Sequence, residues 1–236
     1  TRDDFIDLAL PLLSEVQANG IMVENVGPAW AIKEKMPEMP IYGGSGLNVW
    51  NHLTAQALAP QFCWLTLSPE LSRHQLKDAV SAIRALPESD APPNLELVVQ
   101  GSLEVMVAED SIPQLAKGSY SDELWGLQDF KHIFPLWVDD EGRTHIFNSA
   151  ETCLIDLLPQ IRRIGLEGVS LDARGRTESY AQEVTGAYNL AIELTERLMA
   201  TDPAPLKEGL LDLKERILPR ALGGITHGHF LRGLKD

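Results

Sequence analysis

The chain has 236 residues, of which 44% are hydrophobic, so it is long and apolar enough to bury a sizeable core. Its formal net charge of -14 argues against nucleic-acid binding, because phosphates are normally met by a basic surface. No window approaches about 18 consecutive apolar residues, which argues against a membrane-spanning helix. The N-terminus TRDDFIDLAL lacks a signal-peptide pattern, so the cytoplasm is the expected location.

Short apolar runs alternate with longer helical patterns along the chain. In order, the predicted elements are helix 5–17, strand 21–24, helix 28–36, strand 41–42, helix 49–58, strand 63–67, helix 76–86, strand 95–99, strand 145–147, helix 151–164, strand 168–171, helix 179–199 and helix 206–217. Short strands that are apolar on both faces and separated by helices are typical of a parallel sheet covered on both sides. The sequence therefore predicts an α/β fold.

The alternation breaks between residues 124 and 139. Two strand-like segments, 125–130 and 133–138, are joined at Lys131-His132 and predict an inserted β-hairpin. We expect residues 1–200 to form a (β/α) barrel domain, with residues 201–236 forming a linker, a helix and a Gly/His-rich arm that pack on it. A closed barrel of this type needs about eight strands. The prediction is therefore a modified or partial TIM-type barrel that lacks two or three upstream βα units.

Polar side chains follow each predicted strand. In parallel α/β folds the carboxyl ends of the strands meet at one edge, where substrates bind. The candidates for substrate binding at these ends are Glu24, Asn48, Glu70, Gln100, Ser102, Asn148 and Asp172. The alternative is that such residues only start loops and cap the next helix, as Ser149 could do.

Glu96 lies inside the apolar strand 95–99. A carboxylate there is costly unless it is paired or faces a polar interior. Arg174 and Arg176 follow strand 168–171, and either could bind a carboxylate through its forked guanidinium. Two interpretations stay open: a catalytic acid, or a Glu–Arg pair that holds the barrel together.

Six stretches, in order, resemble the collagenase-like peptidases of family U32. They are MVENVGPAWAIKE, IYGGSGLNVWN, LTLSPELS, ELVVQGSLEVM, THIFNSAETCLIDLLPQI and VSLDARGRTESYAQEV. The resemblance covers nearly the whole chain and implies a modified (β/α) barrel with further βα units upstream. It also implies a peptidase, with zinc proposed in some members and an iron–sulfur cluster held by four cysteines in others.

The chain departs from this family at its metal-binding positions. Glu104 stands where the signature has a cysteine, and Gln100 stands where it has a histidine. Ser111 and Gly142 replace further cysteines of similar sequences, and the cluster insertion is reduced to a loop at 116–121. Either Glu104 replaces the cysteine as a ligand, or it marks where a metal centre used to be.

Only Cys63 and Cys153 are present, too few for a four-cysteine iron–sulfur cluster or a disulfide framework. If zinc is bound, the candidate ligands are Glu104, His145 and Asp110. The tail offers a His-x-His pair at 227 and 229, but two ligands do not make a site.

The resemblance implies peptide-bond hydrolysis of a peptide or protein substrate. No serine or cysteine nucleophile stands beside an obvious base, so a water activated by a carboxylate or a metal is the more economical nucleophile. The candidate catalytic residues are Glu96 and Glu104 as carboxylates, His145 as acid–base or ligand, and Arg174 or Arg176 for an oxyanion.

Two other functions stay open. The chain could be a non-catalytic barrel that binds a ligand or partner, having lost its metal centre with the cysteines. A third prediction is an RNA- or quinone-modifying enzyme. A homo-oligomer that shares a pocket is also consistent with a partial barrel.

Overall fold

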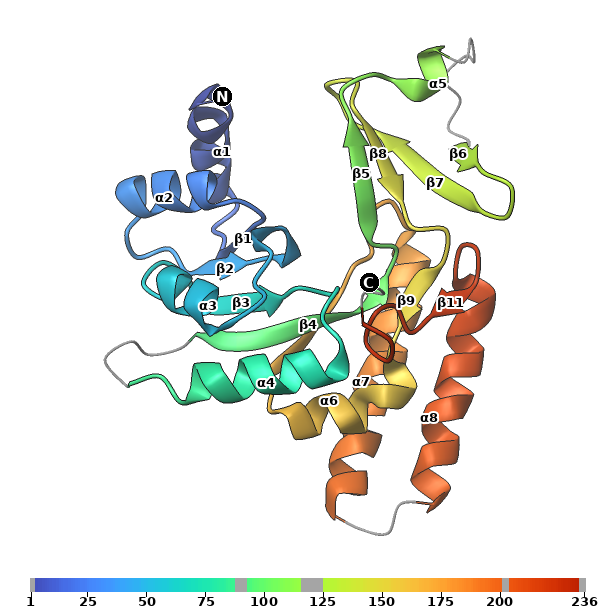
Figure 1. The fold of residues 1–236 in the computed structure, drawn as a ribbon. Helices are drawn as coiled ribbons and strands as arrows, with labels where there is room; N and C mark the ends of the chain where they lie inside the picture. Colours follow the sequence, from blue (N-terminus) through green and yellow to red (C-terminus); the bar gives the residue numbers. More distant parts are fainter. Residues whose placement is uncertain (1–2, 88–92, 116–124, 201–203, 234–236) are drawn as a thin grey trace. The chain divides into compact units, whose positions relative to one another are not determined.

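A computed structural model of the chain describes residues 3–87, 93–115, 125–200 and 204–233 (Figure 1). The chain forms two compact units, each built from separate segments. Unit 1 contains Thr1–Val98, Ile161–Val169 and His229–Asp236, and unit 2 contains Val99–Gln160 and Ser170–Gly228. No helix in the described ranges has the length and apolarity needed to cross a membrane. The division near residue 200 stays a prediction.

Unit 1 is a parallel sheet with helices. Its elements are α1 (Asp3–Glu15), β1 (Ile21–Val23), α2 (Val26–Lys35), β2 (Ile41–Gly43), the 3₁₀ turn η1 (Ser45–Leu47), α3 (His52–Leu58), β3 (Trp64–Leu67), α4 (Arg73–Arg84) and the start of β4 (Asn94–Gly101). The strands pair in parallel in the order β1-β2-β3-β4. This confirms the predicted alternation of parallel strands and helices for the first half of the chain.

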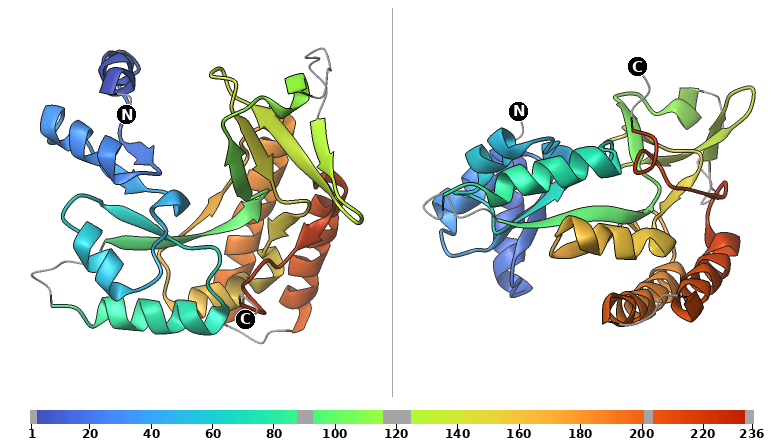
Figure 2. Two further views of the ribbon diagram at one scale, coloured as in Figure 1. Left: turned by 45° about the horizontal axis from the view of Figure 1, so that its top comes forward. Right: turned by 60° about the horizontal axis from the view of Figure 1, so that its bottom comes forward.

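Helix α4 shows how local sequence positions an element of unit 1. Ser72 caps its first turn, because the Ser72 side chain accepts from the backbone N–H of Gln75 while the Gln75 side chain accepts from that of Ser72. Leu76, Val80 and Ile83 recur at helical spacing and are buried. This apolar stripe is therefore buried, and the helix runs alongside β4 in both Figure 1 and Figure 2.

Unit 2 contains a four-stranded antiparallel sheet. Its strands are β5 (Glu104–Ala108), β6 (Trp125–Gln128), β7 (Ile133–Val138) and β8 (Thr144–Phe147), in the order β5-β8-β7-β6, with a short helix α5 (Ile112–Leu115) after β5. The predicted hairpin is present as β6 and β7. Asp129 closes it by accepting from the backbone N–H groups of Lys131 and His132 at 2.7 and 2.6 Å.

The rest of unit 2 is built around two long helices. Its elements are β9 (Glu151–Cys153), the 3₁₀ turn η3 (Ile155–Leu157), α7 (Glu178–Ala200), α8 (Ala204–Ile217), the 3₁₀ turn η4 (Leu218–Arg220) and β11 (Ile225–Thr226). Helices α7 and α8 pack side by side (Figures 1 and 2). The end of β4 pairs antiparallel with β9, and β11 pairs in parallel with β9. The remaining elements are helix α6 (Leu158–Ile164) and strand β10 (Gly168–Leu171), which pairs with β4. The chain changes from unit 2 to unit 1 within α6 and returns to unit 2 within β10.

Gly101 ends β4 with a φ of 125°, a conformation that L side chains rarely adopt. A Cβ at this position would collide with the backbone carbonyl of Asp172. The backbone of Asp172 lies this close because its N–H donates to the carbonyl of Gln100 at 2.8 Å. The glycine is therefore required by close packing of two chain segments.

Two predicted elements are wrong. Residues 145–147 were expected as a parallel barrel strand, but β8 lies in the antiparallel sheet between β5 and β7. Residues 151–153 were expected to begin a helix, but they form the buried strand β9, and α6 begins only at Leu158. Pairing with β4 and β11 overrides the local helical pattern.

The fold is mixed α/β with a parallel-strand sheet, and the strand pairings of the described ranges do not close into a barrel. A TIM-type barrel is therefore not confirmed. The reduced loop predicted at 116–121 lies outside the described residues, as do the first residues of the predicted linker, 201–203.

Candidate functional site

Two of the predicted catalytic residues, Glu104 and His145, meet in unit 2. Glu104 begins β5 and His145 lies on the neighbouring strand β8. A register shift between Glu104 and Met106 turns the Glu104 side chain to the face that carries His145. Its Oε2 lies 2.7 Å from Nδ1 of His145. The side chains are 30% and 16% exposed respectively, so water can reach the pair.

Asp139 is a third member that the sequence did not indicate. It follows β7 directly, and its Oδ2 lies 3.3 Å from Nε2 of His145. Arg143 holds this carboxylate with two donors: its backbone N–H donates to Oδ1 at 2.9 Å, and its Nε donates to Oδ2 at 2.7 Å. Asp139 belongs to a run of acids before Gly142, and such a run is typical of a hairpin turn. Nothing in this pattern indicates that Asp139 contacts the imidazole.

The pKa of Asp139 reflects these contacts. Burial acts to raise it, but hydrogen bonds from the backbone and side chain of Arg143 and from His145 outweigh burial and lower it below the ordinary value of 3.8. Asp139 is therefore a carboxylate at neutral pH.

Two carboxylates and an aromatic ring surround His145. Both ring nitrogens face carboxylate oxygens, and an imidazole can donate to both only when doubly protonated. The Trp137 ring packs against it with centroids 4.9 Å apart, as a cross-strand neighbour on β7. An aromatic face stabilises a nearby cation. This arrangement suits a proton donor next to a carboxylate base.

The pH dependence of stability should report on Asp139. The pKa of Asp139 is lower in the folded chain than in the unfolded chain, so the unfolded chain takes up the proton first as the pH falls. The carboxylate therefore stabilises the fold above pH 3.8, and this contribution is lost as the pH falls through the folded-state pKa. We expect the difference in melting temperature between the wild-type chain and Asp139→Asn to shrink as the pH is lowered from 6 toward about 3. Asp140→Asn, at the exposed neighbouring position, is the control and should show a smaller difference. A gap between wild type and Asp139→Asn that stays constant with pH would contradict this assignment.

A second polar group in unit 2, the Glu151 cluster, consists of Gln100, Glu151, Arg176 and Tyr180. Glu151 is fully buried, and one oxygen accepts from Tyr180 Oη at 2.6 Å and from Gln100 Nε2 at 3.2 Å. The other oxygen accepts from the backbone N–H of Leu222 at 2.9 Å and forms an ion pair with Arg176. Each oxygen of this carboxylate thus has two donors, which come from three segments of the chain.

The environment of the Glu151 cluster shifts two pKa values. Burial raises the pKa of Tyr180 and lowers that of Arg176, the directions expected when the charged form of each group leaves water. The guanidinium of Arg176 also stacks on the Tyr180 ring, 3.9 Å from its centroid. The Tyr180 hydroxyl is therefore a neutral hydrogen-bond donor to Glu151.

The model of Peptidase family U32 matches residues 4–233, nearly the whole chain. The chain belongs to Peptidase family U32. No curated protein and no solved structure matches it. Membership supports a peptidase or another family-level function.

In this U32 chain the predicted arginines bind carboxylates other than Glu96. Arg176 binds Glu151, and Arg174 binds Asp172 with Nη2 2.6 Å from Oδ2. Glu96 lies in unit 1, where it accepts from Thr66 Oγ1 at 2.7 Å. In place of the predicted pairing with an arginine, Glu96 accepts a hydrogen bond from an uncharged hydroxyl group on the adjacent strand. The sequence did not indicate Glu151 or Tyr180 as members of a polar cluster, because each lies at the start of a predicted helix, 151–164 and 179–199.

The predicted substrate-binding residues of the U32 chain fall in both units. In unit 1, Glu24 accepts from the backbone N–H of Gly46 and fills a space that a Cβ at Gly44 would occupy. Asn48 Oδ1 accepts from Trp50 Nε1 at 2.6 Å. The remaining candidates are Glu70 in unit 1 and Gln100, Ser102, Asn148 and Asp172 in unit 2. Of these, Gln100 is fully buried within the Glu151 cluster, so a substrate does not reach it directly.

The predicted zinc ligands are only partly brought together. Glu104 and His145 meet, whereas Asp110 is joined to this sheet through its backbone carbonyl, which accepts from Thr144 Oγ1 at 2.7 Å. Across the described residues no group of three or more His, Cys, Asp or Glu side chains is placed to hold a metal ion. Catalytic zinc normally has three protein ligands, so this donor set does not fit it.

Proposed function

We propose that the chain hydrolyses peptide bonds and that Glu104 and His145 form its acid–base pair. The observation that carries the proposal is the 2.7 Å contact between Glu104 Oε2 and His145 Nδ1 on a partly exposed face of unit 2. Family membership supports the reaction class. The two residues come from adjacent strands of a rigid sheet, which holds them in a fixed geometry.

The reaction assigns one proton transfer to each residue. Glu104 accepts a proton from a water molecule whose oxygen forms a bond to the carbonyl carbon. Once Glu104 has taken that proton, the His145 imidazolium donates the proton on its Nδ1 to the amide nitrogen, and the C–N bond breaks to release the amine. The proton on Glu104 then passes across the 2.7 Å contact to the imidazole, which restores both groups.

Asp139 acts as a positioning residue in this scheme. Its carboxylate faces the second ring nitrogen of His145 and is itself held by Arg143. This fixes the plane of the imidazole ring. Arg174 and Arg176 take no part, because each binds a carboxylate elsewhere in unit 2. No step uses a metal.

The reaction class is tested by looking for new peptide termini. The purified chain is incubated with a mixed peptide library in water enriched in oxygen-18, and the products are identified by mass spectrometry. We expect new carboxyl groups that contain one labelled oxygen, because water is the nucleophile. His145→Asn protein prepared in the same way is the control for a contaminating peptidase. If no new termini arise, or if both preparations yield the same termini, the proposal fails and a non-catalytic binding protein takes its place.

A further inference from the structure

The antiparallel sheet of unit 2 has an open edge at β5. In the order β5-β8-β7-β6, β5 pairs with β8 on one side, and no strand of the described ranges pairs with its other side. Backbone N–H and C=O groups on that side point away from the sheet and can form hydrogen bonds to an added strand. Figure 1 shows β5 at one border of this sheet.

Successive apolar side chains of β5 are exposed on both faces of the strand. Val105, Met106 and Val107 are 55%, 60% and 45% exposed. Edge strands are commonly protected by lysine, proline or a bulge. Here β5 contains no lysine or proline, and the register irregularity is confined to its start, between Glu104 and Met106. Its remaining length is a regular, unprotected edge.

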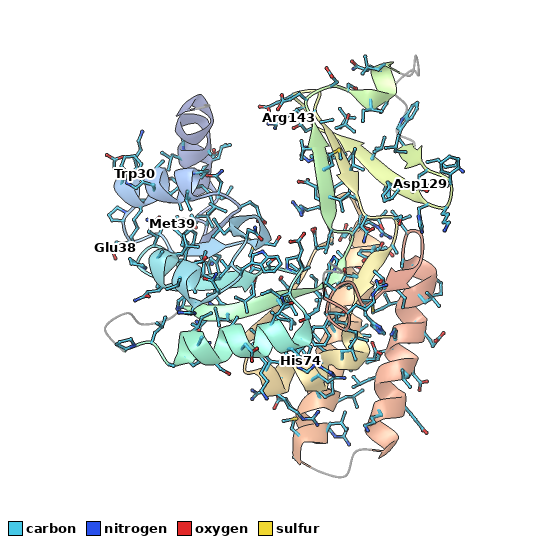
Figure 3. The ribbon with its side chains drawn as sticks, in the orientation of Figure 1. Trp30, Glu38, Met39, His74, Asp129 and Arg143 are labelled. Atoms are coloured by element: carbon cyan, nitrogen blue, oxygen red, sulfur yellow. The ribbon has the colours of Figure 1, made fainter. Side chains whose placement is uncertain are left out.

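Acidic residues gather where this apolar strand ends. Glu109 and Asp110 follow β5 directly and are exposed. The turn from Asp139 to Glu141 lies at the same end of the sheet, because Ala108 and Val138 both align with Thr144. Arg143, which is labelled in Figure 3, follows this turn, and its guanidinium binds Asp139 and Glu141. Among described residues between 104 and 147, seven are acidic and two are lysine or arginine.

The acidic residues near β5 favour a basic polypeptide segment over a second copy of this chain as the binding partner. A second copy of this chain would bring a further net charge of -14 to an already acidic edge. An extended segment with apolar residues in its centre and lysine or arginine at its end complements both the exposed side chains and the acids.

We propose that β5 binds such an apolar, basic-ended segment of another polypeptide by strand addition. The bound strand would lie beside Val107, whose register neighbour on β8 is His145. The inference concerns binding and stands whether or not the segment is cleaved.

A peptide titration tests the proposal. The probe is a fluorescent peptide of alternating valine and threonine with two lysines at each end, and its anisotropy is measured against the full chain. We expect saturable binding that weakens at least about tenfold in Met106→Lys, because the new charge repels the peptide and disrupts the apolar contact. Leu53→Lys, an equally exposed leucine in unit 1, is the matched control and should bind as the wild type does.

Two altered peptides separate strand addition from adsorption. A peptide with proline at alternate central positions lacks the N–H groups that strand addition needs, and one with glutamates in place of the lysines lacks the charge complementarity. Both should bind at least about tenfold more weakly. Equal binding of either peptide, or no effect of Met106→Lys, overturns the proposal.

Sedimentation velocity tests whether a second copy of this chain, instead of another polypeptide, covers β5. If the wild-type chain is a dimer and Met106→Lys is a monomer, a second copy covers β5 and the proposal is overturned. Binding is also measured with His145→Asn. Peptide binding without cleavage in both His145→Asn and the wild type supports strand addition while showing that the proposed hydrolysis fails.

Discussion

Replacement of Glu104 by glutamine should lower kcat/KM for peptide hydrolysis at least about 100-fold, the usual contribution of a general base. Glutamine keeps the size of the side chain and its contact with His145 but cannot accept the proton of the attacking water. The rate is measured on a peptide identified by its new termini. Folding is checked by the melting temperature, which should change little because Glu104 lies at the surface.

The matched control is Glu193→Gln, which removes an exposed carboxylate on helix α7, outside the antiparallel sheet. It should keep the wild-type rate. His145→Asn should be as slow as Glu104→Gln, and the double variant should be little slower than either, because the two groups act as a unit. Full activity of Glu104→Gln would remove Glu104 from the mechanism.

Loss of the guanidinium of Arg176 should destabilise unit 2 by about 3–5 kcal/mol, the usual cost of breaking a buried ion pair. In Arg176→Met the carboxylate of Glu151, which is fully buried, keeps its neutral donors but loses its only described positive partner. The free energy of unfolding is measured by urea denaturation of the purified chain, followed by far-ultraviolet circular dichroism.

Arg174→Met is the matched control. Its ion pair with Asp172 has an arginine side chain that is 56% exposed, against 13% for Arg176. Exposed pairs contribute about 0–1 kcal/mol, so this variant should unfold close to the wild type. A second variant that replaces both Glu151 and Arg176 with apolar residues should recover part of the loss, because no charge is then left buried. If Arg176→Met and Arg174→Met cost the same, the Glu151 cluster is not a stabilising ion pair.

The parallel part of unit 1 could be predicted because each of its strands and helices is indicated by residues within the element or next to it. Strands β2, β3 and β4 are short runs in which residues such as Ile41, Leu65 and Leu95 are fully buried, and the capping pattern at Ser72 marks the start of α4. The hairpin of β6 and β7 could also be predicted, since its turn residues lie beside its two strands. Membership of the U32 family followed in the same way from short motifs in order along the chain.

The candidate site could be predicted only one residue at a time. Glu104 was singled out because it replaces a cysteine of the family signature, and His145 because it precedes a matched motif. Nothing in either stretch shows that β5 pairs with β8 or that a bulge turns Glu104 toward the imidazole. Asp139 joins them only because β7 lies on the other side of β8.

By itself the sequence determined the family, the α/β character and the identity of two site residues. The tertiary structure decided which strands are neighbours, and so placed β8 in an antiparallel sheet and Glu151 in the interior. The physical reason is that apolar periodicity records which face of a segment is buried, but not which distant segment covers it. A buried carboxylate such as Glu151 is stabilised by Arg176, Tyr180 and the backbone of Leu222, partners that only the folded chain brings together.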